Sequence, residues 1–401
     1  MKTRILRNAL ILGLISAIGP FAIDMYLPAL PSIGRSLGAG AGAVQMSLSV
    51  FFIALSLGQP ICGPLSDRFG RKAPLYVGLC VFAAATLGCA LAPNVTTLIV
   101  FRFLQGVGAC PGLVIPRAVV RDLHTGLDAT RLMSLLMLVF SVSPILAPLT
   151  GSFVIEFAGW RGVFWTVLAA SIVGLGISTL LAETRARAAR AASSLAGALG
   201  AYRRLLRDRA FLGLTFVAAF GLSSFFVYLA NSPFVLIEHY HLSPRLYSLL
   251  FSLNAASFFA TAQLNGWLAQ RIGLKRLVRR AATGFALVML ALLALFALGV
   301  DRLTVLVAML FAGFGCLGML LPTATVLALE EHGSIAGTAS AFMGTVQFAT
   351  GSAVMLLVGA LASSSPVPML AGIAVCALLA LALERATDRA PHPLLRATSG
   401  G

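Results

Sequence analysis

Long apolar runs, separated by short polar or basic stretches, dominate this 401-residue sequence. Runs long enough to cross a hydrocarbon core of about 30 Å predict twelve spanning helices. They cover roughly residues 9–30, 43–66, 73–92, 95–116, 132–155, 162–182, 210–237, 246–270, 281–300, 303–329, 335–361 and 367–383. The pattern predicts an all-α membrane protein of two pseudo-symmetric six-helix bundles. The bundles are 1–182 and 210–385, with a basic, Ala-rich linker at 183–209 and a tail at 386–401.

One inter-helix segment occurs twice. Residues 63–72, GPLSDRFGRK, return in weaker form at 266–275, GWLAQRIGLK, an offset of 203. A C-x-G-x-x-x-P pattern at 110–116 returns at 316–322, an offset of 206. A segment that recurs half a chain later indicates two homologous bundles in tandem, which is the internal repeat of secondary transporters.

The composition excludes an ordinary soluble domain. Charged residues make up 10% of the chain, against about 25% in soluble domains, and the mean hydropathy is +0.96. The net charge of +16 raises the question of nucleic acid. With the N-terminus in the cytoplasm, however, 24 of the 29 Lys and Arg residues fall on the inner side. This bias follows the positive-inside rule, so we expect both termini and the linker to be cytoplasmic and no nucleic-acid partner. The linker is expected either to lie on the inner leaflet as a helix or to act as a solvated tether.

Four motifs then carry a family resemblance. Segment 63–72 resembles motif A of the major facilitator superfamily, and R-x-x-Q-G-x-G at 102–108 is similar to its motif B. A-P-x-x-G at 147–151 resembles the antiporter motif C, with Thr150 where glycine is more usual. The octet DMYLPALP at 24–31 is similar to the bicyclomycin/chloramphenicol-resistance (Bcr/CflA) branch of drug:proton antiporters. This resemblance implies a multidrug efflux transporter of the bacterial inner membrane.

Motif A supplies a candidate conformational latch. Its residues are Gly63, Asp67, Arg68, Gly70 and Arg71. The glycines permit close approach and turning, and Asp67 is suited to accept hydrogen bonds from helix N-terminal amides. The resemblance implies contacts between the two bundles that form in one state and break in the other, whereas a plain topology signal is the alternative. Gln270 replaces the acid in the second copy, so a second latch would be weaker.

Asp24 and Arg102 are the ionisable residues placed well inside predicted spans. A charge at the centre of a lipid-facing helix costs about 2.5–3.5 kcal/mol, and such residues are usually functional. Both lie about 9–11 Å below the outer helix ends at 1.5 Å per residue, so they can face one cavity at one level. Burial and a nearby guanidinium act on the carboxyl group in opposite senses, which suits a proton-coupling pair. A static salt bridge is the alternative.

The predicted span at 132–155 and the space between the bundles supply the remaining candidates. Pro144, Pro148 and Gly151 predict a hinge or seal near the outer face, or an ordinary proline kink. A substrate cavity is expected near the midplane. Its candidate lining residues are Asp24, Tyr26, Arg102, Gln105, Phe225, Phe226, Tyr228, Asn231, Asn254 and Gln347.

These patterns favour proton-coupled antiport of small amphipathic drugs by alternating access. Metabolite uptake by proton symport on the same fold remains an alternative. A polytopic membrane enzyme would need a catalytic cluster near one interface, and the sequence contains none. The six cysteines have neither metal nor disulfide spacing. We therefore expect no cofactor and no metal. The expected partners are a drug, protons and the bilayer, and the expected state is a monomer.

Overall fold

The computed structural model describes residues 2–123, 126–185, 195–361 and 365–388, and within these ranges the secondary structure is helical, without strands. The first part of the chain forms α1 Lys2–Asp24, η1 Leu27–Ala29, α2 Leu30–Leu37, α3 Ala41–Phe69, α4 Lys72–Ala90, α5 Val95–Leu123 and α6 Gly126–Ser178. The second part forms α8 Leu195–Leu205, α9 Arg209–Pro233, η2 Phe234–His239, α10 Pro244–Gln263, α11 Asn265–Ile272, α12 Leu274–Ala297, α13 Leu303–Glu330, η3 Gly333–Ile335, α14 Ala336–Ala360 and α15 Pro366–Asp388.

Ten of the described segments are long and apolar enough to cross a membrane. The expectation of twelve differs at two places. α6 runs through two of the predicted spans, and its backbone breaks at Gly159, where φ is 65° and ψ is −174°. The run predicted at 246–270 is divided between α10 and α11, and the serines, asparagine and glutamine of α10 make it less apolar than the other segments.

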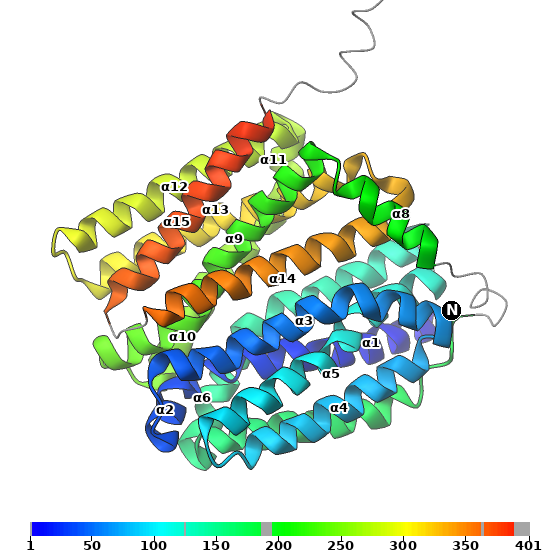
Figure 1. Ribbon diagram of the computed structural model, residues 1–401, viewed down its shortest axis with the longest axis horizontal. Helices are drawn as coiled ribbons and strands as arrows, with labels where there is room; N and C mark the ends of the chain where they lie inside the picture. Colours follow the sequence, from blue (N-terminus) through cyan, green and yellow to red (C-terminus); the bar gives the residue numbers. More distant parts are fainter. Residues whose placement is uncertain (1, 124–125, 186–194, 362–364, 389–401) are drawn as a thin grey trace, which may run out of the picture.

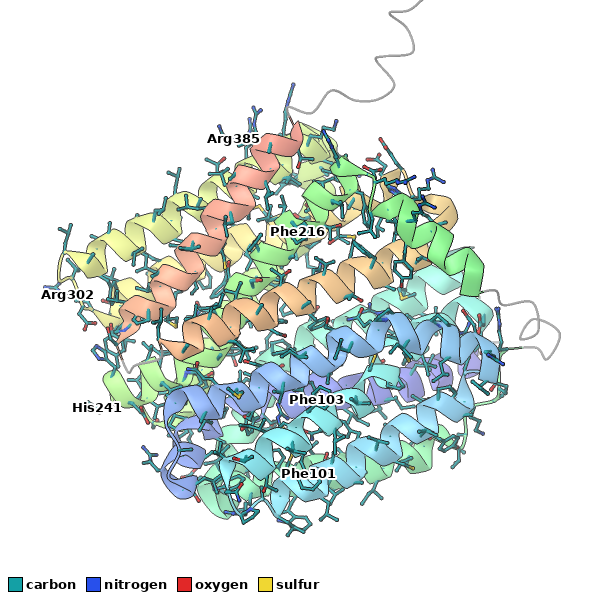
Figure 2. All side chains as sticks on the ribbon, in the orientation of Figure 1. Phe101, Phe103, Phe216, His241, Arg302 and Arg385 are labelled. Atoms are coloured by element: carbon teal, nitrogen blue, oxygen red, sulfur yellow. The ribbon has the colours of Figure 1, made fainter. Side chains whose placement is uncertain are left out.

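The helices pack as two groups, which we call the N half (α1 to α6) and the C half (α9 to α15). In Figure 1 the N half is the blue-to-mint group below and the C half is the green-to-red group above, with α3 beside α14 where they meet. α6 also packs on α10. One end of the molecule, the linker end, carries α8 and the turn at Gly70. The opposite end, which we call the Gly159 end, carries the turns at Gly159 and Gly299. Figure 2 places Arg302 and His241 at the Gly159 end and Arg385 near the end of α15.

The two copies of the repeated motif share one backbone conformation. Gly70 separates α3 from α4 with φ 90°, and Gly273 separates α11 from α12 with φ 82°. These angles lie in a region that only glycine adopts without strain. The repeat seen in the sequence is therefore a repeat of the same turn.

The linker is held at both of its described ends. Residues 183–185 contact the N half, while α8 packs against α14, where the Tyr202 and Phe342 rings lie 6.0 Å apart. Leu205 is fully buried in a small cluster with Phe211 and Met343. The linker was expected to be either a helix on the inner leaflet or a solvated tether, and neither expectation included a helix packed on the C half. Residues 186–194 of the linker and residues 389–401 of the expected tail lie outside the described residues.

Candidate functional site

Asp24 occupies the position where the first spanning helix breaks. Pro28 and Pro31 are the second residues of η1 and α2. In the first turn of a helix a missing amide proton is tolerated, but prolines at these places prevent α1 from continuing. The carboxyl group is 4% exposed and accepts a hydrogen bond from Ser143 Oγ on α6, at 3.2 Å. Asp24 is thus buried and accepts one hydrogen bond, from a neutral side chain.

Arg102 is fully buried inside the N half. Its Nη1 donates to Gln105 Oε1 at 2.7 Å and to the Ala22 carbonyl at 3.3 Å. The guanidinium carbon lies 4.5 Å from the centre of the Tyr26 ring and 4.6 Å from that of Phe51. Aromatic faces attract a cation, by about 2 kcal/mol or more when it is desolvated. Nε and Nη2 have no hydrogen-bond partner among the described residues, so the site leaves two donors of a buried cation free.

The structure does not bring Asp24 and Arg102 together as an ion pair. Arg102 reaches α1 at the Ala22 carbonyl, two residues before Asp24, but its head is turned towards the inside of the N half. Asp24 is turned towards α6 and Ser143. This differs from the expectation of a facing pair. The aromatic rings and Gln105 hold the guanidinium away from the carboxyl group.

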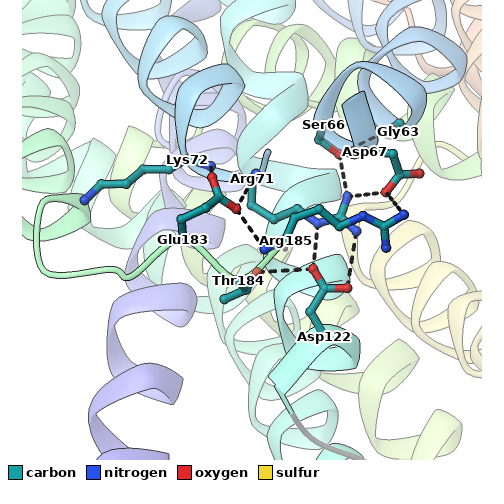
Figure 3. Close-up of polar contacts among 9 residues, drawn as sticks. All are labelled: Gly63, Ser66, Asp67, Arg71, Lys72, Asp122, Glu183, Thr184 and Arg185. Carbon is teal, nitrogen blue, oxygen red and sulfur yellow. Dashed lines mark hydrogen bonds and ion pairs between the residues drawn. The ribbon is translucent and has the colours of Figure 1, made fainter. Parts of the chain in front are cut away.

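The motif A residues form a compact polar cluster, shown in Figure 3. Arg71 is 5% exposed and donates two hydrogen bonds to Asp122, from Nε at 2.8 Å and from Nη2 at 3.3 Å. Its Nη1 contacts Asp67 at 2.7 Å and Ser66 Oγ at 2.8 Å. Burial acts to raise the pKa of Asp122, but the hydrogen bonds and charge of Arg71 hold it below its ordinary value. The guanidinium fork therefore stabilises the charged form of Asp122.

Glu183 belongs to the same cluster, although the sequence did not single it out. Its two carboxylate oxygens accept from the backbone amides of Arg71 at 2.9 Å and Lys72 at 3.1 Å. These amides begin α4, where an acceptor is otherwise lacking. Thr184 donates to Asp122 at 3.1 Å and ties the same segment to α5. The sequence signal that could have identified it is the scarcity of acidic residues. The chain has 13 Asp and Glu residues, and two of them, Asp122 and Glu183, follow apolar runs at this end of the molecule.

Two expectations for motif A change, and the latch between the halves, expected to form in one state and break in the other, stays a prediction. The helix amides are capped by Glu183, while Asp67 pairs with Arg71. The described partners of Arg71 belong to the N half and the start of the linker, so in this conformation its contacts lie within one half. A Cβ at Gly63 would meet nothing within 4 Å, so close approach does not explain that glycine, whereas the φ of Gly70 does require one. Arg68 lies 5.7 Å from the Phe69 ring and is exposed.

The proline-containing stretch of α6 packs tightly on the chain that follows α1. A Cβ at Gly151 would lie 2.4 Å from the Met25 carbonyl oxygen and 2.9 Å from its Cα. Pro148 and Pro144 lie about one and two turns earlier inside the same helix. The glycine predicted for close packing is thus in contact with the residue after Asp24.

The same stretch of α6 meets α10 across the two halves. Three polar contacts cross here: Ser248 Oγ donates to the Pro148 carbonyl at 2.8 Å, Ser252 Oγ donates to the Ile145 carbonyl at 2.7 Å, and Arg245 pairs with Glu156. We call this set of contacts the α6–α10 seam. It lies towards the Gly159 end and fastens the halves together there.

The residues predicted to line a substrate cavity separate into two groups. Asp24, Tyr26, Arg102 and Gln105 are buried within the N half. The others lie in or beside the C half, where Asn231 accepts from Gln45 of α3 at 3.1 Å and Asn254 donates to the Tyr228 hydroxyl at 2.9 Å.

Aromatic rings fill the centre of the interface. Phe226 stacks on Phe52 of α3, with ring centroids 4.2 Å apart, and lies 5.7 Å from Phe348 of α14. Phe225 packs against Phe314 of α13, and Gln347 is half-buried on α14. A recess of about 120 Å³ between α3 and α14 is lined by none of the predicted cavity residues. Asn231 and Phe226 are thus placed where the halves meet around α3 and α14.

No group of three metal-binding side chains occurs among the residues that the structure describes. The site therefore consists of a buried carboxyl group, a buried guanidinium, a polar cluster at the linker end and the α6–α10 seam.

The fold and the apolar helices are those of a multi-pass membrane transporter. Residues 12–355 match the family model described as Major Facilitator Superfamily, and the chain belongs to this family. The xylose transporter of Escherichia coli has the same fold, with a TM-score of 0.76 and 15% identity over 97% of this chain and 100% of the other.

Curated relatives are similar over most of their length. An uncharacterised MFS-type transporter of Bacillus subtilis, YdgK, is 37% identical over 92% of both chains. Multidrug resistance protein D of Escherichia coli K12 is 31% identical over 84% of both, and a bicyclomycin resistance protein homolog of Haemophilus influenzae is 29% identical over 93% of this chain and 94% of its own. These relatives confirm the resemblance to the drug-resistance branch, and they identify a transporter rather than an enzyme.

Proposed function

We propose that this protein is a proton-coupled exporter of small amphipathic drugs in the bacterial inner membrane. The observation that carries the proposal is Asp24, a buried carboxyl group at the break of a spanning helix, with a neutral donor and no cation as partner among the described residues. An ionisable group at membrane depth has a high cost and is usually retained for function. The names of the drug-resistance relatives support export over uptake.

The proposed architecture has twelve crossings in two six-helix bundles. α6 contributes two crossings because it reverses at Gly159, and α10 with α11 contributes one more. The proposed domains are 1–182 and 210–385, joined by a linker at 183–209, and the carrier is proposed to act as a monomer. The positive-inside bias supports a cytoplasmic linker end. The Gly159 end is then periplasmic.

The contacts between the halves support an inward-facing conformation. The α6–α10 seam lies towards the Gly159 end, and Gln45 joins Asn231 in the same part of the molecule. A Cβ at Gly42, at the start of α3, would lie 2.8 Å from the Gly359 carbonyl of α14. These contacts close the periplasmic path, and they have to break when the carrier opens outwards.

Proton and drug are proposed to compete for Asp24. The ionised carboxylate offers an acceptor to a drug from the cytoplasm, and protonation from the periplasm removes it. One charge moving inwards across 100 mV gains about 2.3 kcal/mol, which sustains a drug gradient of roughly forty- to fifty-fold because 1.4 kcal/mol is a factor of ten. Arg102 is proposed to keep the neighbourhood of α1 positive, which favours release of the proton to the cytoplasm.

The test is drug accumulation in cells that express wild type, Asp24→Asn or Ser143→Ala, with and without a protonophore. Chloramphenicol and bicyclomycin are the first substrates to use, because relatives are named for resistance to them. We expect wild type to lower accumulation, the protonophore to abolish this, and Asp24→Asn to abolish it without loss of protein from the membrane. Ser143→Ala keeps the carboxyl group and is the matched control, with partial activity expected.

Two results would overturn the proposal. Export by wild type that ignores the protonophore would exclude proton coupling, and normal export by Asp24→Asn would remove the acid from its role. Faster drug entry with wild type would favour symport on the same fold.

A further inference from the structure

A pocket of about 380 Å³ lies between the two halves at the Gly159 end. Its N-half wall consists of α2 and the turn that follows α2, and its C-half wall consists of η2, on which α2 packs (Figure 1). Small-molecule sites in proteins have volumes of about 300–1,000 Å³, so this pocket has room for a small ligand. It shares no lining residue with the α6–α10 seam or with the recess between α3 and α14.

The lining of the pocket combines missing side chains with apolar ones. Gly34 and Gly38 leave space on the N-half side, and Gly38 ends α2 with φ 60°, a conformation that favours glycine. Pro31 of α2 and Phe234 of η2 are both buried and supply apolar surface from each half. The pocket can therefore cover an apolar group of a ligand as well as a polar one.

Two opposite charges line the same pocket, one from each half. Arg35, in the last turn of α2, is exposed, and Glu238, in η2, is half-buried. Neither side chain forms an ion pair or a hydrogen bond with any described residue, so the two charges do not neutralise each other. A guanidinium binds a carboxylate well, and a carboxylate binds an ammonium group. This arrangement fits a ligand that carries both charges.

The C half fixes the backbone on either side of Glu238. η2 is a π-helical turn, in which the Tyr240 amide donates to the Val235 carbonyl at 3.1 Å. His239 Nε2 lies 2.6 Å from Asp301 Oδ2, and the Tyr240 hydroxyl donates to the same carboxylate. Such turns are rare and are frequent at functional sites. The residues after Glu238 are thus tied to the loop between α12 and α13, while Glu238 itself lines the pocket.

We propose that this pocket binds a small amphipathic zwitterion from the periplasm. Arg35 binds the carboxylate of the ligand and Glu238 binds its ammonium group, while the apolar part lies against Pro31 and Phe234. The periplasmic placement rests on the proposed function. Because its two charged contacts come from different halves, the ligand bridges the halves and favours the conformation in which the pocket is formed. It therefore slows the outward opening that export requires.

The test measures binding of radiolabelled glycylphenylalanine to the purified protein in detergent, by equilibrium dialysis. This dipeptide carries an ammonium group, a carboxylate and one benzyl group. The loss of one exposed ion pair lowers affinity up to about fivefold, so we expect Arg35→Gln and Glu238→Gln each to bind it about fivefold more weakly than wild type. Arg302→Gln removes an exposed arginine at the same end but outside the pocket, and it should bind like wild type.

Single-charge analogues show which side chain contacts which end of the dipeptide, and with wild type they need no variant. The C-terminal amide lacks the carboxylate, so wild type should bind it about fivefold more weakly than the dipeptide. Arg35→Gln should bind the two equally. The N-acetyl dipeptide lacks the ammonium group and gives the same comparison for Glu238→Gln. Equal binding of all three ligands by wild type overturns the site.

A charge exchange tests the pair as a pair. Arg35→Glu places two acids at the pocket and should weaken binding, whereas Arg35→Glu combined with Glu238→Arg restores one charge of each sign and should recover affinity. Absence of recovery counts against the site. The binding measurements involve no movement of drug or protons, so they can fail while the proposed function stands.

Two further arms test the source of the ligand and its effect. Equal binding in nanodiscs of phosphatidylglycerol and of phosphatidylethanolamine supports a soluble ligand, whereas loss of binding in phosphatidylethanolamine assigns the pocket to that headgroup and overturns the proposal. In proteoliposomes that exchange radiolabelled chloramphenicol, saturating dipeptide on both faces should slow exchange by wild type and not by Arg35→Gln. An unchanged wild-type rate refutes the bridge between the halves, and a wild type that exchanges no drug even without the dipeptide counts against the proposed function instead.

Discussion

Replacing Arg71 by alanine tests the polar cluster at the linker end. Arg71 makes two hydrogen bonds to Asp122 and contacts Asp67 and Ser66. Removing one partner of a buried ion pair costs about 3–5 kcal/mol, and a hydrogen bond to a charged group contributes about 1.5–3 kcal/mol. The Asp67 side chain is 38% exposed and that of Asp122 is 15% exposed, so water partly replaces the lost donor. We therefore expect Arg71→Ala to lower the free energy of unfolding by about 2–3 kcal/mol.

Asp67→Asn and Asp122→Asn supply the internal comparison for this prediction. Exposed pairs contribute about 0–1 kcal/mol, so Asp67→Asn should cost little. Asp122→Asn removes the carboxylate that the fork binds, so its cost should approach that of Arg71→Ala. Reversible unfolding by SDS in mixed micelles measures the three costs, with the fluorescence of the three tryptophans as the signal. An Arg71→Ala protein that is no less stable than Asp67→Asn would refute the reasoning, because the fork to Asp122 would then contribute nothing.

Two further predictions follow from the same structure. The pKa of Asp122 is lower in the folded state than its unfolded value of about 3.9, so the ionised carboxylate stabilises the folded state at pH values above about 3.9. This stabilisation is lost as the pH falls through the pKa of the folded state. Wild type should therefore lose more stability than Asp122→Asn between pH 5 and about pH 3, and parallel losses in the same SDS titration would contradict this. Gly151→Ala should destabilise by about 1–3 kcal/mol and reduce export, because its Cβ would overlap the Met25 backbone. Gly176→Ala, also in α6 and with open space around it, is the control in a thermal-stability assay, and equal effects would argue against the close contact.

Burial and turns were predictable from the sequence. Asp24 and Arg102 stand inside apolar runs, and both are buried. The glycines at 70 and 273 occupy matching places in the repeated motif, and both adopt a positive φ. Such features follow from local sequence because a long apolar run must be buried in lipid or protein, and because few residues other than glycine adopt that backbone conformation.

Partners across space were not predictable. The depth estimate placed Asp24 and Arg102 at one level, but depth does not fix the rotation of a helix about its axis, and rotation decides which neighbour a side chain meets. Glu183 and Asp122 end apolar runs, where an acid is ordinarily solvated, so nothing local distinguishes them from surface charges.

The two copies of the repeated motif share a turn but not its contacts. In the first copy Arg71 binds two acids and the α4 amides are capped by Glu183. In the second copy Gln270 stands where the acid was, and Arg271 instead lies 4.1 Å from the centre of the Trp267 ring. α11 has no buried residues, so besides the stacking of Arg271 on Trp267 this turn has few buried contacts. An exposed stack of this kind contributes about 0.5–1 kcal/mol, against about 2–3 kcal/mol expected for the fork. Relative motion of the two halves at the linker end is therefore easier to accommodate by local change around α11 than around the first copy, where the charged cluster ties α3, α4 and α5 together.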